Sequence, residues 1–407
     1  MTTTTFVTEF QPTRAELAAC VQCGLCLPHC PTFRLTGLEI ASPRGRLAAM
    51  NAVADGIVAL DATFEETMTF CLNCRACEAV CPSLVPFGRA MEGARAELTA
   101  QRPSLSRRLR HLAVGRLLPS RPLVRTVTVL MSAGQRLHFE RLLRGKWSRA
   151  LKGLRRLRKV RDSTSLAPSS RPTRGTAALL RGCVMEPWFP AVNRAAVDLL
   201  SRAGYRVTIP EQQTCCGALA AHDGDLVQAR RLAERNEKAF AAADLVVATA
   251  AGCSAHLKEY DHLLKQPGRL ASKAKDVTEV IAGMIDEGAL PTLDQGEVRV
   301  AVQDPCHLRH AQRITRAPRL IITAAGLQPV EIDADGLCCG AAGIYSLLRP
   351  EASAQLGARK AAQVTASHCQ VVASANPGCE MQLRAHLGPG YEIAHPIELY
   401  WQAALPG

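Results

Sequence analysis

The sequence lacks any apolar run long enough to cross a membrane, which takes about 18 uninterrupted residues. Its most apolar stretch, residues 241–251, is short and contains Asp244. The sequence also lacks a P-loop and a glycine-rich dinucleotide fingerprint at a strand-to-helix turn. A self-contained oxidoreductase would need a flavin, a nicotinamide or an acid–base pair. We therefore expect no FAD or NAD on this chain, and expect any substrate oxidation to take place on a partner.

A secretory signal is not visible either, because residues 1–20 contain no charged region followed by an apolar core. We therefore expect a cytoplasmic protein whose seventeen cysteines stay reduced and available to metal. The chain has 407 residues, of which 47% are hydrophobic, so it has room for two or three domains.

Eight of the cysteines form two copies of one motif, CxxCxxCxxxCP, at residues 20–31 and 71–82. Three thiolates separated by two residues can reach three corners of a [4Fe-4S] cluster, whereas the fourth cysteine, just before proline, ligates the other cluster. The predicted ligand sets are therefore crossed. One cluster takes Cys20, Cys23, Cys26 and Cys81, and the other takes Cys71, Cys74, Cys77 and Cys30.

Zinc and disulfides are the alternative roles for these cysteines. A structural zinc ion takes four tetrahedral ligands, usually two CxxC pairs, and would leave the third and fourth cysteines of each motif without a role. Disulfides need an oxidising compartment, which the amino-terminal sequence does not indicate. The motif spacing therefore favours two [4Fe-4S] clusters, with electrons passing between them.

Positive charge is concentrated in one region of the chain. Residues 102–161 contain eighteen Lys and Arg against a single acid, Glu140, a local net charge of +17. The end of this region predicts an amphipathic basic helix, with apolar residues at steps of three and four: Leu143, Trp147, Leu151, Leu154 and Leu157. Residues 162–175, rich in Ser, Pro and Arg, predict an exposed linker.

The composition of the basic region is consistent with three functions. It is a solvated surface or partner-binding surface, a nucleic-acid site, or a peripheral membrane site on the anionic cytoplasmic leaflet. Nucleic-acid binding is disfavoured, because residues 102–161 offer only Phe139 and Trp147 as aromatic platforms. For membrane binding, the apolar stripe would enter the headgroup boundary and these residues would face phosphates: Arg149, Lys152, Arg155, Arg156 and Arg158.

The second half of the chain is an internal repeat. Cys183 and the Cys215-Cys216-Gly217 turn recur 123 residues later, and a Gly-Cys pair at Cys253 recurs 126 residues later. These eight cysteines are either packing residues or ligands of a further iron–sulfur site, and their repetition favours ligation. They are Cys183, Cys215, Cys216, Cys253, Cys306, Cys338, Cys339 and Cys379. Cys369 has no counterpart in the first repeat, so we expect it to pack in the core.

Short apolar runs precede four of these cysteines, at residues 177–182, 245–252, 298–305 and 370–378. Helical stretches at 225–243 and 350–365 lie between them. This alternation predicts a mostly parallel sheet, whose ligands bind at the carboxyl ends of the strands. The expected fold is mixed α and α/β. Its expected divisions are a helical two-cluster ferredoxin domain (1–100), a basic segment with linker (101–175), and two cysteine-rich CCG repeats (176–290 and 291–407).

A two-cluster ferredoxin module followed by a duplicated CCG domain resembles the iron–sulfur subunits of bacterial glycolate oxidases. The segment Ser42–Leu47 and the DPCH sequence at Asp304–His307 also resemble this family. The resemblance implies an electron-transfer subunit that carries electrons from flavoprotein subunits, which oxidise glycolate to glyoxylate, towards a quinone or other acceptor. It implies a cytoplasmic location at the inner face of the membrane. Lactate dehydrogenases, anaerobic glycerol-3-phosphate dehydrogenases and heterodisulfide reductases have subunits of similar plan.

One departure from related CCG domains concerns the end of each repeat. There the family pattern closes with CxxC, and it can hold a non-cubane iron–sulfur cluster. In this sequence the last position is His256 in the first repeat and Gln382 in the second. A heterodisulfide-type site is therefore in doubt in both repeats. His256 is either a replacement ligand or a solvated residue at the start of a helix.

Overall fold

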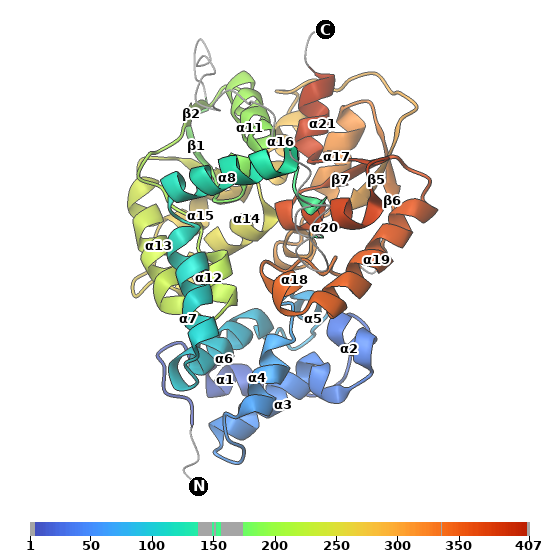
Figure 1. The fold of residues 1–407 in the computed structure, drawn as a ribbon. Helices are drawn as coiled ribbons and strands as arrows, with labels where there is room; N and C mark the ends of the chain where they lie inside the picture. The colour runs from blue at the N-terminus through green and yellow to red at the C-terminus, as the bar shows by residue number, and fades with distance from the viewer. Residues whose placement is uncertain (1–4, 137–148, 150–151, 156–173, 335, 405–407) are drawn as a thin grey trace.

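The computed structural model describes residues 5–136, 149, 152–155, 174–334 and 336–404. A helical amino-terminal part lies beneath two α/β units that stand side by side (Figure 1). The predicted mixed α and α/β class is confirmed. Among the described residues, no helix combines the length and the apolar character that a bilayer span requires.

The amino-terminal part is a set of short helices around one apolar core. The elements are α1 (Arg14–Ala18), α2 (Pro31–Thr36), η1 (Glu39–Ala41), α3 (Pro43–Ala54), α4 (Ala62–Thr69), α5 (Ala76–Ala79) and α6 (Phe87–Gln101). Met50, Met68 and Met91 are fully buried in this core. The helices start at clear caps: Ser42 accepts a hydrogen bond from Gly45 N, and Asp61 accepts one from Phe64 N.

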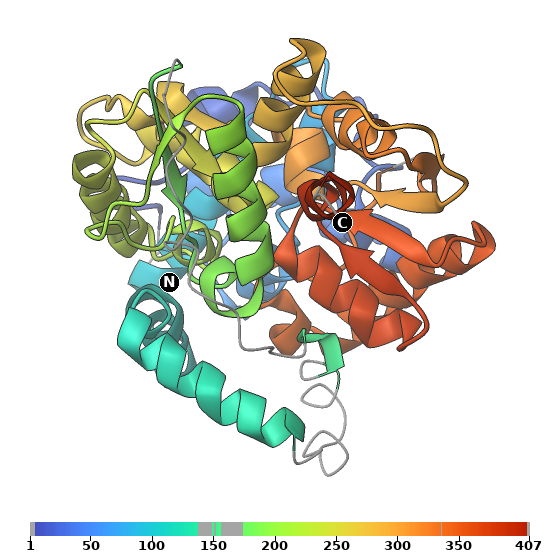
Figure 2. The ribbon, with the colours of Figure 1, turned by 90° about the horizontal axis from the view of Figure 1, so that it is seen from above.

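The basic region continues as a helical arm. It consists of α7 (Leu105–His111), the π-helical turn η2 (Leu112–Leu117) and α8 (Arg121–Arg136). Seen from above, α8 runs along the outside of the first α/β unit (Figure 2). Met131 packs against the core of the α/β units. Leu123, Val127 and Leu130, at steps of four and three, are instead 37%, 44% and 66% exposed. Most of the amphipathic helix expected near residues 143–161 lies outside the described residues.

The first α/β unit has a four-stranded, fully parallel sheet with strand order β2-β1-β3-β4. Its strands are β1 (Thr176–Leu180), β2 (Arg206–Thr208), β3 (Leu245–Ala248) and β4 (Ala274–Asp276). Its helical elements are α10 (Met185–Trp188), α11 (Pro190–Arg202), α12 (Ala218–His222), α13 (Leu226–Ala239), α14 (Ala251–Leu257), η5 (Tyr260–His262), α15 (Leu270–Lys273) and α16 (Val277–Asp286).

The second unit repeats this topology with strand order β6-β5-β7-β8, again fully parallel. Its strands are β5 (Arg299–Gln303), β6 (Gln328–Glu331), β7 (Val371–Ser374) and β8 (Glu392–Ala394). Its helical elements are η6 (His307–Ala311), α17 (Arg316–Ala324), α18 (Tyr345–Leu348), α19 (Pro350–Ala366), α20 (Pro377–Leu387) and α21 (Pro396–Ala403). The matching strand orders confirm that the sequence repeat is a repeat of structure.

The two units share one hydrophobic core. Leu200 of α11 and Ile281 of α16, from the first unit, pack in the same cluster as Ile321 of α17 and Tyr400 of α21, from the second. Burying an aliphatic or aromatic side chain of this size contributes about 2 kcal/mol. The shared core therefore fixes the two sheets relative to one another, and with them the cysteines at their strand ends.

Candidate iron–sulfur sites

The first cysteine motif forms the loop between α1 and α2. Gln22 and Gly24 have positive φ angles of 54° and 86°, which turn the backbone within the loop whose three thiols line one small cavity. Cys30 is the N-cap residue of α2, and Pro31 occupies the first helical turn. Proline suits that position because its missing N–H would have no helical partner.

The second motif forms the loop around α5 in the same way. Asn73 and Arg75 have φ angles of 52° and 61°, so both adopt the left-handed conformation although neither is glycine. Arg75 is held by salt bridges to Glu78 and to Glu259 of the first α/β unit. The strained loop is therefore fixed partly by the repeat that it faces.

Two small cavities separate the thiols into the two sets that crossed ligation requires. A cavity of about 40 Å³ is lined by Cys20, Cys23, Cys26 and Cys81, and is also touched by Cys77. A cavity of about 20 Å³ is lined by Cys30, Cys71, Cys74 and Cys77. Cys77 thus borders both cavities, which places them side by side. The role of these eight thiols as ligands stays a prediction.

Cationic and N–H groups surround the thiols of the second cavity. Nη1 of Arg46, a fully buried side chain, lies 4.0 Å from Cys30 Sγ, and the backbone N–H of Asn73 donates to Cys71 Sγ at 3.3 Å. Burial raises the pKa of the Cys74 and Cys77 thiols. Buried thiols with raised pKa values stay protonated unless a cation stabilises the thiolate, and a metal centre supplies that charge.

The four cysteines of the first repeat lie close together in two pairs. Sγ of Cys183, after β1, is 3.4 Å from Sγ of Cys215, and Sγ of Cys216 is 3.3 Å from Sγ of Cys253 in α14. Gly217 follows the pair with φ of 93°, a conformation that glycine adopts without steric cost.

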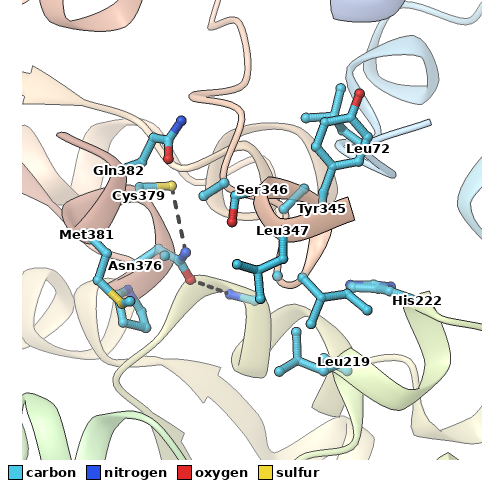
Figure 3. Close-up of a pocket in the computed structure, with 18 of the residues that line it drawn as sticks. Leu72, Leu219, His222, Tyr345, Ser346, Leu347, Asn376, Cys379, Met381 and Gln382 are labelled. Carbon is cyan, nitrogen blue, oxygen red and sulfur yellow. Dashed lines mark hydrogen bonds between the residues drawn. The ribbon is translucent and has the colours of Figure 1, made fainter. Parts of the chain in front are cut away.

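The second repeat places its cysteines in the corresponding positions. Gly340 N donates to Cys338 Sγ at 3.5 Å, and Asn376 Nδ2 donates to Cys379 Sγ at 3.7 Å (Figure 3). Gly340 has φ of 86°, and a Cβ there would lie 2.8 Å from Ser353 O, so only glycine fits this turn. Cys306 Sγ lies 3.5 Å from Nδ1 of His307.

All eight repeat cysteines line one cavity of about 430 Å³, here called the central cavity. The repeats meet at its wall, where Asn376 Oδ1 accepts a hydrogen bond from Gly252 N at 3.2 Å (Figure 3). Cys71 and Leu72 of the amino-terminal part also line it. Because Cys71 borders the second small cavity as well, the three cysteine-lined cavities form a continuous row.

The thiols surround cavities and do not meet at one point. In the described ranges, no three His, Cys, Asp or Glu side chains converge closely enough to hold a single metal ion. The fit to a polynuclear iron–sulfur group therefore rests on the lining of the cavities by sets of four thiols.

Two residues outside the cysteine sets were also assigned roles from the sequence. Cys369 is 2% exposed and packs with Val364 and Val372 in the core of the second repeat, so its predicted packing role is confirmed.

His256 is not a solvated residue, because it is only 5% exposed within α14. Burial lowers the pKa of His256 to about 4, so its ring is neutral at physiological pH. Its counterpart Gln382 donates to Ser353 O at 2.9 Å.

Comparison with known families matches both parts of this arrangement. The 4Fe-4S dicluster domain family matches residues 16–85, and the cysteine-rich domain family matches residues 177–258 and 300–384. The probable glycolate oxidase iron-sulfur subunit of Bacillus subtilis (strain 168) is 35% identical over 96% of this chain and 94% of its own length. The glycolate oxidase iron-sulfur subunit of Escherichia coli (strain K12) is 30% identical over 95% and 94%.

The chain belongs to the family of glycolate oxidase iron–sulfur subunits. The family resemblance inferred from the motifs is therefore confirmed. A more distant relative, lactate utilization protein A of Oceanobacillus iheyensis, is 28% identical over 53% of this chain and 93% of its own length.

One expectation for the basic region of this family member is wrong. Leu154, expected in a membrane headgroup boundary, packs against the shared core. Arg155, expected to face phosphates, instead bonds Glu380 at 2.6 and 2.8 Å and Glu398 at 2.9 and 2.8 Å, with its guanidinium 4.7 Å above the ring of Phe189. These two carboxylates are only 2% and 6% exposed, so water does not stabilise their charge and a buried cation must do so.

Sequence reasoning missed a polar cluster beside the central cavity. Nδ1 of His222, in α12, lies 2.7 Å from Glu92 Oε1 of α6 and 3.1 Å from Asn73 Nδ2. Tyr345, in the equivalent position of the second repeat, donates to Phe70 O at 3.2 Å. The 123-residue offset relates His222 to Tyr345, so the repeat itself was the signal that could have paired them.

Proposed function

We propose that this chain is the electron-transfer subunit of a glycolate-oxidising complex. Flavoprotein subunits of that complex would oxidise glycolate to glyoxylate, and this chain would carry the electrons towards a quinone or another acceptor. The observation that supports this most is the continuous row of three cysteine-lined cavities, which runs from the amino-terminal loops to the space between the repeats.

In this proposal the amino-terminal loops hold two [4Fe-4S] clusters with crossed ligands. Cys20, Cys23, Cys26 and Cys81 would hold one, and Cys30, Cys71, Cys74 and Cys77 the other. Each cluster supplies reversible one-electron transfer when bound. The chain would hold the loops in place, bury the second ligand set in the surrounding core, and direct the N–H of Asn73 and the guanidinium of Arg46 at its sulfur atoms, which would raise the reduction potential of that cluster.

The central cavity would be the third redox site, after the two amino-terminal clusters. The eight repeat cysteines would hold a further iron–sulfur site there, and the remaining space would admit the acceptor. A volume of about 430 Å³ falls within the range of small-molecule sites, about 300–1,000 Å³. Because His256 and Gln382 stand where a second cysteine would close each repeat, we do not extend a heterodisulfide reductase function to this chain.

Glycolate is the favoured substrate class of the partner, because the glycolate oxidase relatives match nearly the whole chain. Lactate is the second candidate, because the lactate utilization relative shares about half of it. We further propose that the complex works at the cytoplasmic face of the membrane. The charge of residues 102–161 and the exposed stripe on α8 support peripheral contact with anionic lipid.

The test of this proposal distinguishes the role of the central cavity from that of the two amino-terminal clusters. Cys216→Ser and Cys339→Ser should each abolish reoxidation of the reduced protein by a quinone analogue, while leaving the electron paramagnetic resonance signals of both amino-terminal clusters intact. Cys369→Ser is the matched control, since that thiol lies in the core of the second repeat. Normal reoxidation in a Cys216→Ser/Cys339→Ser double variant would reduce those cysteines to packing residues.

A further inference from the structure

A half-buried pair of His222 and Glu92 sits beside the central cavity, at the point where the amino-terminal part meets the first repeat. His222 lines the cavity together with Leu219 and Tyr345 (Figure 3), and its side chain is 25% exposed. Its Nδ1 faces Glu92 at 2.7 Å. Because a carboxylate only accepts hydrogen bonds, Nδ1 carries a proton towards Glu92. Nε2 is then the ring nitrogen left to serve the cavity.

The carboxylate of this pair stays ionised. Burial by itself would raise the pKa of Glu92, but the hydrogen bond and charge of His222 lower it to about 2. An ionised carboxylate stabilises an imidazolium at hydrogen-bond distance. The pair also lies next to the second cysteine motif, since Asn73, between Cys71 and Cys74, places its Nδ2 3.1 Å from His222 and 3.3 Å from Glu92 Oε1.

Charged and titratable groups from several elements face this ring. Besides Glu92, α6 contributes Arg95, whose Nη1 donates to His222 O at 2.6 Å. The rings of His307 in η6 and His256 in α14 lie 5.2 and 6.3 Å from that of His222. Arg75 adds a positive charge near Glu92. Of these charged groups, Glu92 is the one in direct contact with a ring nitrogen of His222, so its charge acts on the ring more strongly than the others.

We propose that His222, oriented by Glu92, is the proton donor for an acceptor that takes up protons with its electrons in the central cavity. The inference rests on the proposed function, because it requires electrons to reach an acceptor there. A quinone that accepts two electrons from the iron–sulfur sites also needs two protons. The Nε2–H bond of His222 breaks, its proton forms an O–H bond on one quinone oxygen, and the second proton comes from water. Solvent then reprotonates the ring, which is partly exposed.

The other histidines around the cavity are less suited to this role. His307 is turned towards Cys306, and its buried Nε2 has no hydrogen-bond partner in the described part of the chain. Nδ1 of His386 lies 2.8 Å from the carbonyl of Gln382 in its own helix. Of the three histidines that line the cavity in the described ranges, His222 is the one that combines a carboxylate partner with partial solvent exposure.

The experiment compares two acceptors in single-turnover reoxidation of the full-length, dithionite-reduced protein. Ferricyanide takes one electron and no proton, whereas a water-soluble quinone analogue takes two of each. In His222→Gln, reoxidation by the quinone should slow by about 100-fold or more, the usual contribution of a general acid, while reoxidation by ferricyanide should change by less than about twofold. Binding of the oxidised quinone, followed by quenching of Trp188 at the cavity wall, should weaken by less than about tenfold.

Two further variants make the outcome specific. Glu92→Gln keeps a hydrogen-bonding group but removes the charge that orients the ring, so quinone reoxidation should slow while ferricyanide reoxidation stays unchanged. His262→Gln is the matched control. His262 is an exposed histidine at the same boundary, 3.0 Å from Arg89 of α6, and its loss should leave both rates unchanged.

Equal slowing with both acceptors in His222→Gln would overturn the proposal, because the ring would then serve structure or electron transfer. Unchanged quinone reoxidation would overturn it as well. If the unmodified protein reoxidises with ferricyanide but neither binds nor reduces the quinone, the proposed acceptor site itself fails. That result is distinguishable, since it appears without any substitution.

Discussion

Cys74, in the second amino-terminal motif, packs in the same buried cluster as Cys338 of the second repeat, with Cys306 at its edge. The two thiols come from opposite ends of the chain. Electron transfer falls off steeply with distance, so we expect transfer between the two candidate redox sites to be fastest across this cluster. Because Cys71 also lines the central cavity, the second motif, and not the first, is the expected link to it.

The first prediction compares one cysteine from each amino-terminal motif. Cys74→Ser should remove the second cluster signal and block delivery to the central cavity, and should also destabilise the interface with the second repeat, where Cys74 is 8% exposed. Cys23 is exposed, so Cys23→Ser should remove only the first cluster signal. Paramagnetic resonance and thermal unfolding under anaerobic conditions measure both effects. Loss of the same signal in both variants would contradict the separate ligand sets.

The second prediction concerns the ion pairs of Arg155. Arg155→Met leaves Glu398 buried without its cation and leaves Glu380 with Arg384 as its remaining cationic partner, which should lower the free energy of unfolding by about 3 kcal/mol. Arg174→Ala is the control. Its ion pair with Glu287 is solvent-exposed and screened by water, so the same measurement should change far less than for Arg155→Met. Equal effects of the two substitutions in urea unfolding would show that the segment around Arg155 is not docked on α20 and α21.

The third prediction concerns pH and His395, the buried N-cap residue of α21. Burial and the charge of Arg155 lower the pKa of His395 to about 3. The unfolded chain, with a histidine pKa of about 6.5, binds the proton first as pH falls. Stability is therefore complete above about pH 6.5 and declines by about 1.4 kcal/mol per pH unit below it, or about 2 kcal/mol by pH 5.

His395→Asn tests this slope, because asparagine keeps the N-cap and does not titrate. The difference in unfolding free energy between the variant and the unmodified protein, followed by the fluorescence of Trp401 in α21, should change by about 2 kcal/mol from pH 7 to pH 5. Parallel pH profiles for the two proteins would mean that His395 is protonated in the native state.

The fourth prediction concerns membrane contact through the basic region. Residues 102–161 carry a net charge of +17, and α8 exposes Leu123, Val127 and Leu130. The purified protein should co-sediment with anionic liposomes but not neutral ones, and binding should weaken as salt rises from about 0.05 to 0.5 M. Leu130→Glu, which replaces an exposed apolar side chain of α8 with a negative charge, should weaken binding to anionic liposomes at every salt concentration. Salt-insensitive binding to both lipids, or none to either, would reject membrane contact and favour a partner-binding surface.

Much of the fold follows from local sequence signals. The strands before Cys183, Cys253, Cys306 and Cys379 were predicted because each is a short run of buried apolar residues, and the structure confirms them. The edge strands were not predicted. Arg206–Thr208 and Glu392–Ala394, for example, have three residues each and carry no apolar run, so only pairing with a neighbouring strand defines them.

The contacts that could not be predicted join residues far apart in the sequence. Nothing near Arg155 in the chain indicates that Glu380 and Glu398 lie beneath it, so its helix was interpreted as a membrane-facing one. His222 and Glu92 are likewise brought together only by the packing of α12 on α6. Spacing within a motif predicts a candidate ligand set, whereas the groups around it depend on tertiary structure.

The most direct test of the central claim is a count of iron, acid-labile sulfide and zinc in the anaerobically purified protein, combined with its paramagnetic resonance spectrum after reduction. Two four-iron clusters predict at least about eight irons per chain, with more if the repeat cysteines bind a further centre. Because Cys77 borders both small cavities, the reduced clusters should interact magnetically. Stoichiometric zinc with little iron, or two signals without interaction, would contradict this account.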